Sequence, residues 1–285
     1  MKKIIILGSA GRLGSYFVKY LKKDNSIFPV SRDKSNPYNV NLYEEIEVNK
    51  LIKKINPDII INCAASTNVD KCINDYDYGY KGNVLIPYNI VKAIKCYNKK
   101  IHLIHFSTDQ VYNKKNIHKN LESEVNISNN YSKTKFYGEK EIKKIKNYTI
   151  IRTNFVGKLS SSKHMSFSDF IINNLQMRKK INMASNIYYN PIHVTFLLKC
   201  VNLLIKQNIK GTYNIGSQEI VSKYDFARKL ANFYSLDSKL IYKYKSEFRH
   251  HKRPLNTSVN TNKFKNKFLM KAPELTKMLK IDNYF

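Results

Sequence analysis

Acidic residues, cysteines and long apolar runs are all scarce in this chain of 285 residues. Asp and Glu together number 21 against 50 Lys and Arg, which gives a formal net charge of +29. Every apolar run is shorter than the roughly 18 residues that would span a bilayer, and the apolar stretch that follows Met1 is too short for a signal peptide. The sequence therefore predicts a cytoplasmic protein without a membrane partner.

Cysteine and histidine offer little for metal binding. The four cysteines, at positions 63, 72, 96 and 200, lack the paired spacing that holds zinc. The histidines have no carboxylates at a useful spacing, so each is interpreted as structural. We expect reduced, mostly buried thiols and no metal site.

The excess of positive charge would suit nucleic acid, a membrane surface or an anionic small molecule. Lysine is spread over nearly the whole chain beside abundant Asn, Ile and Tyr, and no recognisable nucleic-acid-binding module is present. This pattern favours compositional bias over a nucleic-acid partner. General attraction of anionic ligands then follows as a side effect.

A glycine-rich segment stands near the N-terminus. Gly8, Gly11 and Gly14 follow the apolar run at 4–7 and precede an amphipathic stretch from Ser15 to Lys22. Such glycines let the backbone turn tightly between a buried strand and a helix and approach a pyrophosphate, whose charge the helix N-terminus stabilises. The segment predicts a dinucleotide-binding loop.

A second motif places a phenol and an ammonium four residues apart. Tyr131 and Lys135 would share one face of a helix. Because the chain contains 21 tyrosines and many lysines, this pair alone is a weak signal. Together, the two motifs indicate a dinucleotide-dependent enzyme.

Strand-like and helix-like segments alternate along the first half of the chain, which is typical of a parallel sheet covered by helices. We expect strands at 3–8, 27–31, 59–64, 102–107 and 149–153 and helices at 12–22, 44–55, 86–95 and 131–146. The alternation loosens after Phe155, where helices at 167–177, 194–206 and 223–235 and a strand at 212–215 are expected. The predicted fold is α/β: a Rossmann-type doubly wound sheet over residues 1–154, and a smaller, mainly substrate-binding lobe over residues 155–285, interleaved with the last strands of the sheet.

Five short sequences, in this order, resemble those of the extended short-chain dehydrogenase/reductases and, among them, the dTDP-4-dehydrorhamnose reductase family. They are GSAGRLG at 8–14, INCAASTNVDK at 61–71, FSTDQVY at 106–112, YSKTKFYGE at 131–139 and RPLNT at 253–257. The second and fourth are the most specific. The resemblance spans nearly the whole chain and implies NAD(P)H-dependent reduction of a nucleotide-linked 4-keto-6-deoxy sugar for surface polysaccharide synthesis.

The resemblance also implies the catalytic residues. Thr108 is expected to hold the substrate carbonyl, Tyr131 to protonate its oxygen, and Lys135 to bind the nicotinamide ribose and lower the tyrosine pKa. This assignment agrees with elementary chemistry, since ketone reduction builds negative charge on oxygen and requires a donor and a proton source there.

Cofactor contacts follow in part from the glycine motif and in part from the resemblance. The expected set is Gly8, Gly11, Arg12, Leu13 and Gly14 at the pyrophosphate, Asn41 and Leu42 near the adenine, and Ala64, Ala65 and Ser66 against the ribose and nicotinamide side. Strict NAD enzymes place an acidic residue after the second strand. Here Ser31 and Arg32 stand there and suit a 2′-phosphate, so NADPH is favoured, while Asp33 keeps NADH open.

The substrate contacts implied by the resemblance are Thr108, Asp109, Phe155 and Arg253. Arg253 is expected at the rim of the cleft, where its planar fork suits a nucleotide diphosphate. The chain departs from the family at two positions, since Gln110 stands where tyrosine is usual and Phe155 where tryptophan is usual. These departures leave the sugar, the nucleotide and the product stereochemistry open.

Two other functions compete with the reductase. A nucleotide-sugar epimerase would retain its NAD, and a reductase-like regulatory subunit would bind a dinucleotide and a partner protein without catalysis. A dehydratase of this superfamily carries an Asp-Glu pair after the threonine, and the amide of Gln110 cannot replace that carboxyl group. The oligomeric state is open, with a homodimer as one candidate.

Overall fold

The computed structural model describes residues 1–97, 100–113, 120–157, 165–247 and 253–279. The chain divides into two compact units. Unit 1 comprises residues 1–108, 129–152 and 200–212, and unit 2 comprises residues 109–128, 153–199 and 213–285. Each unit is therefore assembled from segments that are separated in the sequence.

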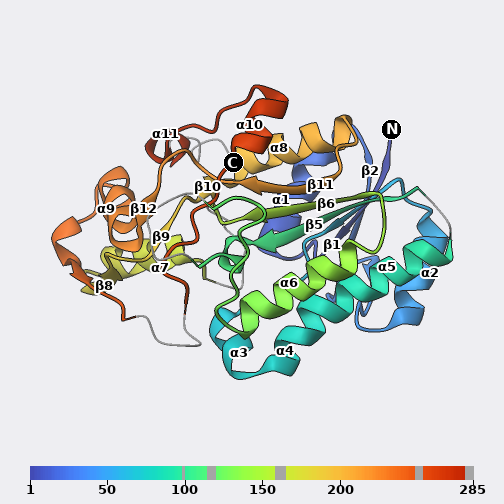
Figure 1. The fold of residues 1–285 in the computed structure, drawn as a ribbon, viewed down its shortest axis with the longest axis horizontal. Helices are drawn as coiled ribbons and strands as arrows, with labels where there is room; N and C mark the ends of the chain where they lie inside the picture. The colour runs from blue at the N-terminus through green and yellow to red at the C-terminus, as the bar shows by residue number, and fades with distance from the viewer. Residues whose placement is uncertain (98–99, 114–119, 158–164, 248–252, 280–285) are drawn as a thin grey trace. The chain divides into compact units, whose positions relative to one another are not determined.

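Unit 1 is built on a seven-stranded sheet with the order β11-β6-β5-β4-β1-β2-β3 (Figure 1). The strands are β1 (Lys3–Leu7), β2 (Ser26–Ser31), β3 (Tyr38–Asn39), β4 (Ile59–Asn62), β5 (His102–Thr108), β6 (Tyr148–Thr153) and β11 (Gly211–Ile215). Five neighbouring strands of this sheet pair in parallel, in the order β5, β4, β1, β2 and β3. Strand order reverses beside β1, with β2 on one side and β4 on the other, which is the point where doubly wound folds bind ligands. The predicted fold class is confirmed.

Helices cover both faces of this sheet, because its central strands are apolar on both sides. The helices of unit 1 are α1 (Arg12–Leu21), α2 (Glu45–Ile55), α3 (Val69–Asn74), α4 (Tyr76–Tyr80), a π-helical turn (Lys81–Leu85), α5 (Ile86–Cys96) and α6 (Asn130–Ile142), with the end of α8 (Val194–Lys206). Figure 1 shows α2, α5 and α6 in a row on one face. Strand residues such as Ile5 and Leu103 form a buried cluster with residues of these helices. On the other face, the Phe17 ring of α1 lies 5.3 Å from the Phe106 ring.

Unit 2 contains short helices and two-residue to four-residue strands. Its elements are a 3-10 turn (Asp109–Val111), β7 (Phe155–Val156), α7 (Phe167–Gln176), β8 (Ile181–Ala184), β9 (Tyr188–Tyr189), β10 (Ile192–His193), β12 (Val221–Ser222), α9 (Lys223–Phe233), a second 3-10 turn (Ser238–Leu240), β13 (Ile241–Tyr244), α10 (Asn262–Phe268) and α11 (Leu275–Leu279). The pairs β7–β10 and β8–β13 are parallel, and β9–β12 is antiparallel.

The expected division is 1–154 and 155–285, with the second lobe interleaved with the last strands of the sheet, and two segments of the chain cross a single boundary of this kind. Residues 109–128 belong to unit 2, where Asn120 pairs with Val259 and its main-chain N–H bonds to the Ser258 carbonyl. Residues 200–212, which comprise the end of α8 and the start of β11, belong to unit 1, whereas the rest of β11 is assigned to unit 2. Segments that are far apart in sequence are exchanged between the units, which composition alone does not reveal.

Membrane-spanning helices and metal clusters are both absent from the described part of the chain. None of its helices is long and apolar enough to cross a membrane. Within the same residues, no group of three His, Cys, Asp or Glu side chains is placed to hold a metal ion. The cysteines in it are free, with Cys72 and Cys200 buried.

Candidate active site

The glycine loop connects β1 to α1 at the carboxyl end of the sheet. Gly8 adopts a φ of +77°, and a Cβ atom on it would lie 2.8 Å from the main-chain nitrogen of Ala64. A Cβ on Gly14 would overlap the carbonyl group of Gly8. Side chains are therefore excluded at both positions, and the loop lies flat against the end of β4.

The N-terminus of α1 fits a phosphate group. Its N-cap residue, Gly11, has an extended backbone and no side chain to cap the helix, and the first turn contains no acidic residue. Arg12 and Leu13 follow it and are both partly exposed. Main-chain N–H groups at an uncapped helix start bind anions and gain from the helix dipole. The loop therefore fits a dinucleotide pyrophosphate.

Three consecutive residues at the end of β2 have different environments. Ser31 is buried, and its hydroxyl accepts a hydrogen bond from the Asp33 main-chain N–H at 3.2 Å. The Asp33 carboxylate accepts bonds from the main-chain N–H and the hydroxyl of Ser35, at 3.1 and 2.9 Å. Arg32 is exposed, and no described residue accepts a hydrogen bond from its guanidinium. The cation is thus available to an anionic group, whereas Asp33 stabilises its own turn.

The other expected cofactor residues lie on neighbouring loops of unit 1. Asn41 and Leu42 precede α2, and the Leu42 carbonyl accepts a hydrogen bond from Asn89 at 3.0 Å. Ala64, Ala65 and Ser66 follow β4, which ends at the same edge of the sheet as β1. Ala64, Ala65 and Ser66 thus lie at the carboxyl side of the parallel strands, where doubly wound folds bind ligands.

The π-helical turn fixes the position of Ser66. Asn83, within that turn, accepts a hydrogen bond from the Ser66 main-chain N–H at 3.0 Å and donates one to the Thr134 hydroxyl at 3.1 Å. A Cβ on Gly82 would overlap Ser66. Neither Asn83 nor Gly82 was identified from the sequence, although the two closely spaced glycines at 79 and 82 are an unusual feature for a helix.

The expected catalytic residues all lie in unit 1. Tyr131 occupies the first turn of α6, whose start is fixed by a capping box between Asn129 and Ser132. Lys135 follows one turn later and donates a hydrogen bond from Nζ to the Phe106 carbonyl at 2.7 Å. Phe106 lies in β5, which ends at Thr108. The structure thus ties Lys135 to the strand that carries Thr108, and all three of the expected catalytic residues are buried.

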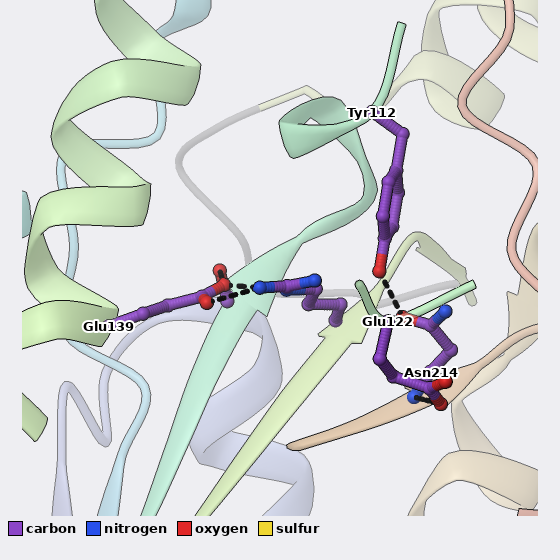
Figure 2. Close-up of polar contacts among 6 residues, drawn as sticks. Tyr112, Glu122, Glu139 and Asn214 are labelled. Carbon is purple, nitrogen blue, oxygen red and sulfur yellow. Dashed lines mark hydrogen bonds and ion pairs between the residues drawn. The ribbon is translucent and has the colours of Figure 1, made fainter. Parts of the chain in front are cut away.

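A buried ion pair holds α6 against the sheet. Glu139 accepts hydrogen bonds from Arg152 Nε and Nη2 at 2.8 and 2.6 Å and from the Ser107 hydroxyl at 2.6 Å. The dashed lines from Glu139 in Figure 2 mark these bonds. At most 1% of either ionic side chain is exposed. Because Glu139 lies one helical turn beyond Lys135, the ion pair sets the position of the face of α6 that carries Lys135.

Burial and local charge act on Lys135 in opposite directions. Desolvation lowers its pKa from 10.5 to about 8, while the Glu139 carboxylate favours the charged ammonium and raises it. Cys63 and the imidazole of His105 lie in the same interior, where burial raises the pKa of the thiol and lowers that of the imidazole. Lys135 therefore carries the positive charge of this region at neutral pH.

The expected substrate residues other than Thr108 lie in unit 2. Asp109 is buried, and its Oδ2 accepts hydrogen bonds from the Thr257 hydroxyl at 2.7 Å and the Asn154 amide at 3.2 Å. Phe155 is half-buried in β7, and Arg253 is exposed. Asp109 and the motif at 253–257 are thus in contact, while no interaction joins Phe155 to Arg253 within the described residues.

A second polar group of unit 2 surrounds Asn214. The Tyr112 hydroxyl donates to Asn214 Oδ1 at 2.8 Å, and the Asn214 main-chain N–H donates to Glu122 at 3.2 Å. Figure 2 shows the Tyr112 ring directed at Asn214. Asn214 also donates to the Asn120 carbonyl at 3.0 Å. These bonds connect the segment after β5 to β11 and give Tyr112 a structural role.

Comparison with known proteins gives a consistent result. The family model described as the RmlD substrate binding domain matches residues 1–281. The chain is 26% identical over 243 residues to the spore coat polysaccharide biosynthesis protein SpsK of Bacillus subtilis, which covers 85% of this chain and 82% of the relative.

Two solved structures have the same fold. A dTDP-4-dehydrorhamnose reductase ortholog from Clostridium acetobutylicum is 27% identical, with a TM-score of 0.86 and coverage of 99% of this chain and 98% of that one. A dTDP-4-dehydrorhamnose reductase from Bacillus anthracis, in complex with NADP, is 24% identical, with a TM-score of 0.88 and coverage of 98% and 97%.

Proposed function

We propose that this chain, which belongs to the RmlD substrate binding domain family, is an NADPH-dependent reductase of a nucleotide-linked 4-keto-6-deoxy sugar. The observation that carries this proposal is the arrangement of α6 and β5. Tyr131 and Lys135 lie on one helix, and Lys135 is bonded through Phe106 to the strand that ends at Thr108. The names of the relatives, which include a polysaccharide biosynthesis protein and dTDP-4-dehydrorhamnose reductases, support the substrate class.

The residues of the site supply the parts of a carbonyl reduction. The glycine loop would hold NADPH, which would supply the hydride for the C4 carbonyl carbon and leave as NADP⁺. Tyr131 transfers its phenolic proton to the carbonyl oxygen, which completes the alcohol, and Thr108 donates a hydrogen bond to the same oxygen. The ammonium of Lys135 stabilises the tyrosinate that remains until it is reprotonated from solvent.

The direct test is oxidation of NADPH in the presence of a 4-keto-6-deoxy nucleotide sugar, followed by absorbance. A panel of dTDP-, UDP- and GDP-linked substrates identifies the nucleotide and the sugar. The sequence does not predict either, because Gln110 and Phe155 differ from the residues that are usual in the family. The absence of turnover with every member of the panel would favour the regulatory-subunit alternative. A cytoplasmic location and a homodimer remain predictions.

We expect NADPH to bind more tightly than NADH by about 1.5–3 kcal/mol, the value of one charge-assisted phosphate contact. Arg32 is exposed at the end of β2, and no described residue pairs with its guanidinium. Arg32→Ala should therefore remove most of the difference, whereas Lys34→Ala should preserve it. Titration of both cofactors against the three proteins measures the effect. Equal affinity of the wild-type protein for NADPH and NADH would exclude Arg32 as the residue that recognises the 2′-phosphate.

Purified protein is expected to contain little bound dinucleotide, because a reductase must exchange its cofactor in every cycle. An epimerase regenerates its cofactor within each cycle and retains it. Absorbance of the supernatant after heat denaturation measures the bound fraction. A stoichiometric amount of NAD in that supernatant would replace the reductase with the epimerase as the preferred function.

A further inference from the structure

A lysine ammonium in unit 2 is enclosed by aromatic rings. Nζ of Lys223, the first residue of α9, lies 3.3 Å from the centroid of the Tyr189 ring and 4.6 Å from that of Phe167. Phe226 packs against both rings, with centroids 5.7 Å from Tyr189 and 5.8 Å from Phe167. No described residue accepts a hydrogen bond from Nζ of Lys223 or forms an ion pair with it. The cation has contact with aromatic faces but no oxygen partner.

The phenol next to this ammonium also lacks a partner. Tyr189 is 1% exposed, and its hydroxyl makes no hydrogen bond to any described residue. A buried hydroxyl without a hydrogen bond costs free energy, as does a desolvated ammonium without an acceptor. Two such groups, adjacent to each other on β9 and α9, form an arrangement that a ligand with acceptor oxygens would complete.

The charges that act on Lys223 determine which ligand fits. Burial lowers the pKa of Lys223 to about 7, the carboxylate of Asp109 raises it, and the guanidinium of Arg253 lowers it. Asp109 also raises the pKa of Tyr189, after burial. Two cations, Lys223 and Arg253, are therefore close enough to influence each other. One carboxylate, Asp109, offsets part of their positive charge. The three charges sum to a positive value, so an anionic ligand matches this balance better than a neutral one.

We propose that Lys223 and Tyr189 form a diphosphate-recognition subsite, in which both side chains bind anionic oxygens of the nucleotide-sugar substrate. This inference rests on the proposed function for the identity of the substrate. Nζ supplies charge-assisted hydrogen bonds, and the Tyr189 hydroxyl supplies one neutral bond. The aromatic rings hold the ammonium in place before the ligand arrives, so that little side-chain entropy is lost on binding.

The test measures binding and requires no turnover. The probe is dTDP-glucose, whose sugar has a hydroxyl group at C4 and cannot be reduced, and calorimetry gives its Kd. We expect Lys223→Met to weaken binding at least about tenfold, and Tyr189→Phe to weaken it about 3- to 10-fold. Lys229→Met is the matched control, because Lys229 lies on the same helix and pairs with Glu219 at the surface. It should bind the probe as the wild-type protein does.

Stability distinguishes this role from a purely structural one. Tyr189→Phe removes only an unpartnered hydroxyl, so its Tm should equal or exceed that of the wild-type protein. If Lys223→Met lowers Tm while neither variant changes the Kd, Lys223 is only a cation–π link between α9 and β9, and the proposal is wrong. NADPH affinity should be the same in all variants. The NADPH affinity reports separately on the dinucleotide site. If the wild-type protein does not bind NADPH, the proposed reductase function is wrong, and the assignment of the diphosphate subsite is unaffected.

The pH dependence of binding provides a second readout. The diphosphate of dTDP-glucose does not titrate between about pH 6 and 9, so the protein determines any slope. Above pH 7 the free protein must take up a proton at Lys223 to bind an anion, and the Kd should rise with pH in the wild-type protein and in Lys229→Met but not in Lys223→Met. UDP-glucuronate, whose sugar carries a carboxylate, is the second probe in the binding experiment. If only its binding depends on Lys223, the subsite recognises a sugar carboxylate and the diphosphate assignment is wrong.

Discussion

Tyr131→Phe should lower kcat by about 10²- to 10⁴-fold, the contribution of a positioned general acid. The substitution removes the proton source and leaves the ring in its buried position on α6. NADPH affinity should change little, because the pyrophosphate is expected to bind at the glycine loop and not at Tyr131. Steady-state kinetics with a reducible nucleotide sugar, together with NADPH titration, measures both quantities.

The matched control is Tyr137→Phe. Tyr137 lies on the same helix and is partly exposed, so it should retain nearly full activity. If Tyr131→Phe kept more than about a tenth of the wild-type kcat, a smaller loss than general acid catalysis entails, another group would have to supply the proton. The reductase assignment would survive that result, but the role of Tyr131 would not.

Glu139→Gln should destabilise the protein by about 3–5 kcal/mol, because it leaves the Arg152 guanidinium buried without a counter-ion. Both side chains are almost completely inaccessible to solvent, so water cannot replace the lost carboxylate. Urea denaturation measures the change in the free energy of unfolding. Glu141→Gln, which loses only a surface pair with Lys144, should change it by less than about 1 kcal/mol.

Replacing both partners separates the cost of an unpaired charge from the value of the pair itself. Glu139→Met combined with Arg152→Met should recover most of the lost stability, since apolar residues of similar volume often replace a buried pair without loss. A double variant as unstable as Glu139→Gln would refute this explanation.

The same substitution should also change the pH dependence of activity. The Glu139 carboxylate raises the pKa of Lys135, which burial holds at about 8, so Glu139→Gln should lower it further. Lys135 then loses its proton at a lower pH, and the alkaline decline in kcat should begin earlier. An unchanged pH profile would show that Lys135 does not act through its charge.

The sequence predicted the fold best where one strand or helix spans many residues of a single pattern. The five expected strands of the first half lie within two residues of β1, β2, β4, β5 and β6. The apolar runs of β1, β4, β5 and β6 are buried on both faces, so burial and pattern agree there, whereas β2 is only partly buried. The helix expected at 131–146 ends earlier, at Ile142, because the chain must turn before Asn147. The Asn147 carbonyl, just before β6, accepts a hydrogen bond from the main-chain N–H of Leu103 in β5.

Short elements and long-range polar contacts were not predictable in this way. The strands of unit 2 include several of only two residues, too short for a period to appear. The π-helical turn depends on the close approach of Gly82 to Ser66, which only tertiary structure defines. Lys223 was placed correctly at the start of a helix, yet its aromatic neighbours come from β9 and α7, and nothing in the local sequence signals them. The roles of the expected site residues remain predictions for the variants above.

The exchange of segments between the two units has a consequence for synthesis on the ribosome. Unit 1 needs residues 200–212, and β11 is the outermost strand, next to β6. Until that segment leaves the exit tunnel, β6 has an unpaired edge, which is a site for incorrect pairing with other chains. Unit 1 therefore completes its sheet only after residues 153–199, which belong to unit 2, have been made. A fragment that ends at residue 154 would expose that edge permanently, so the two halves mature together.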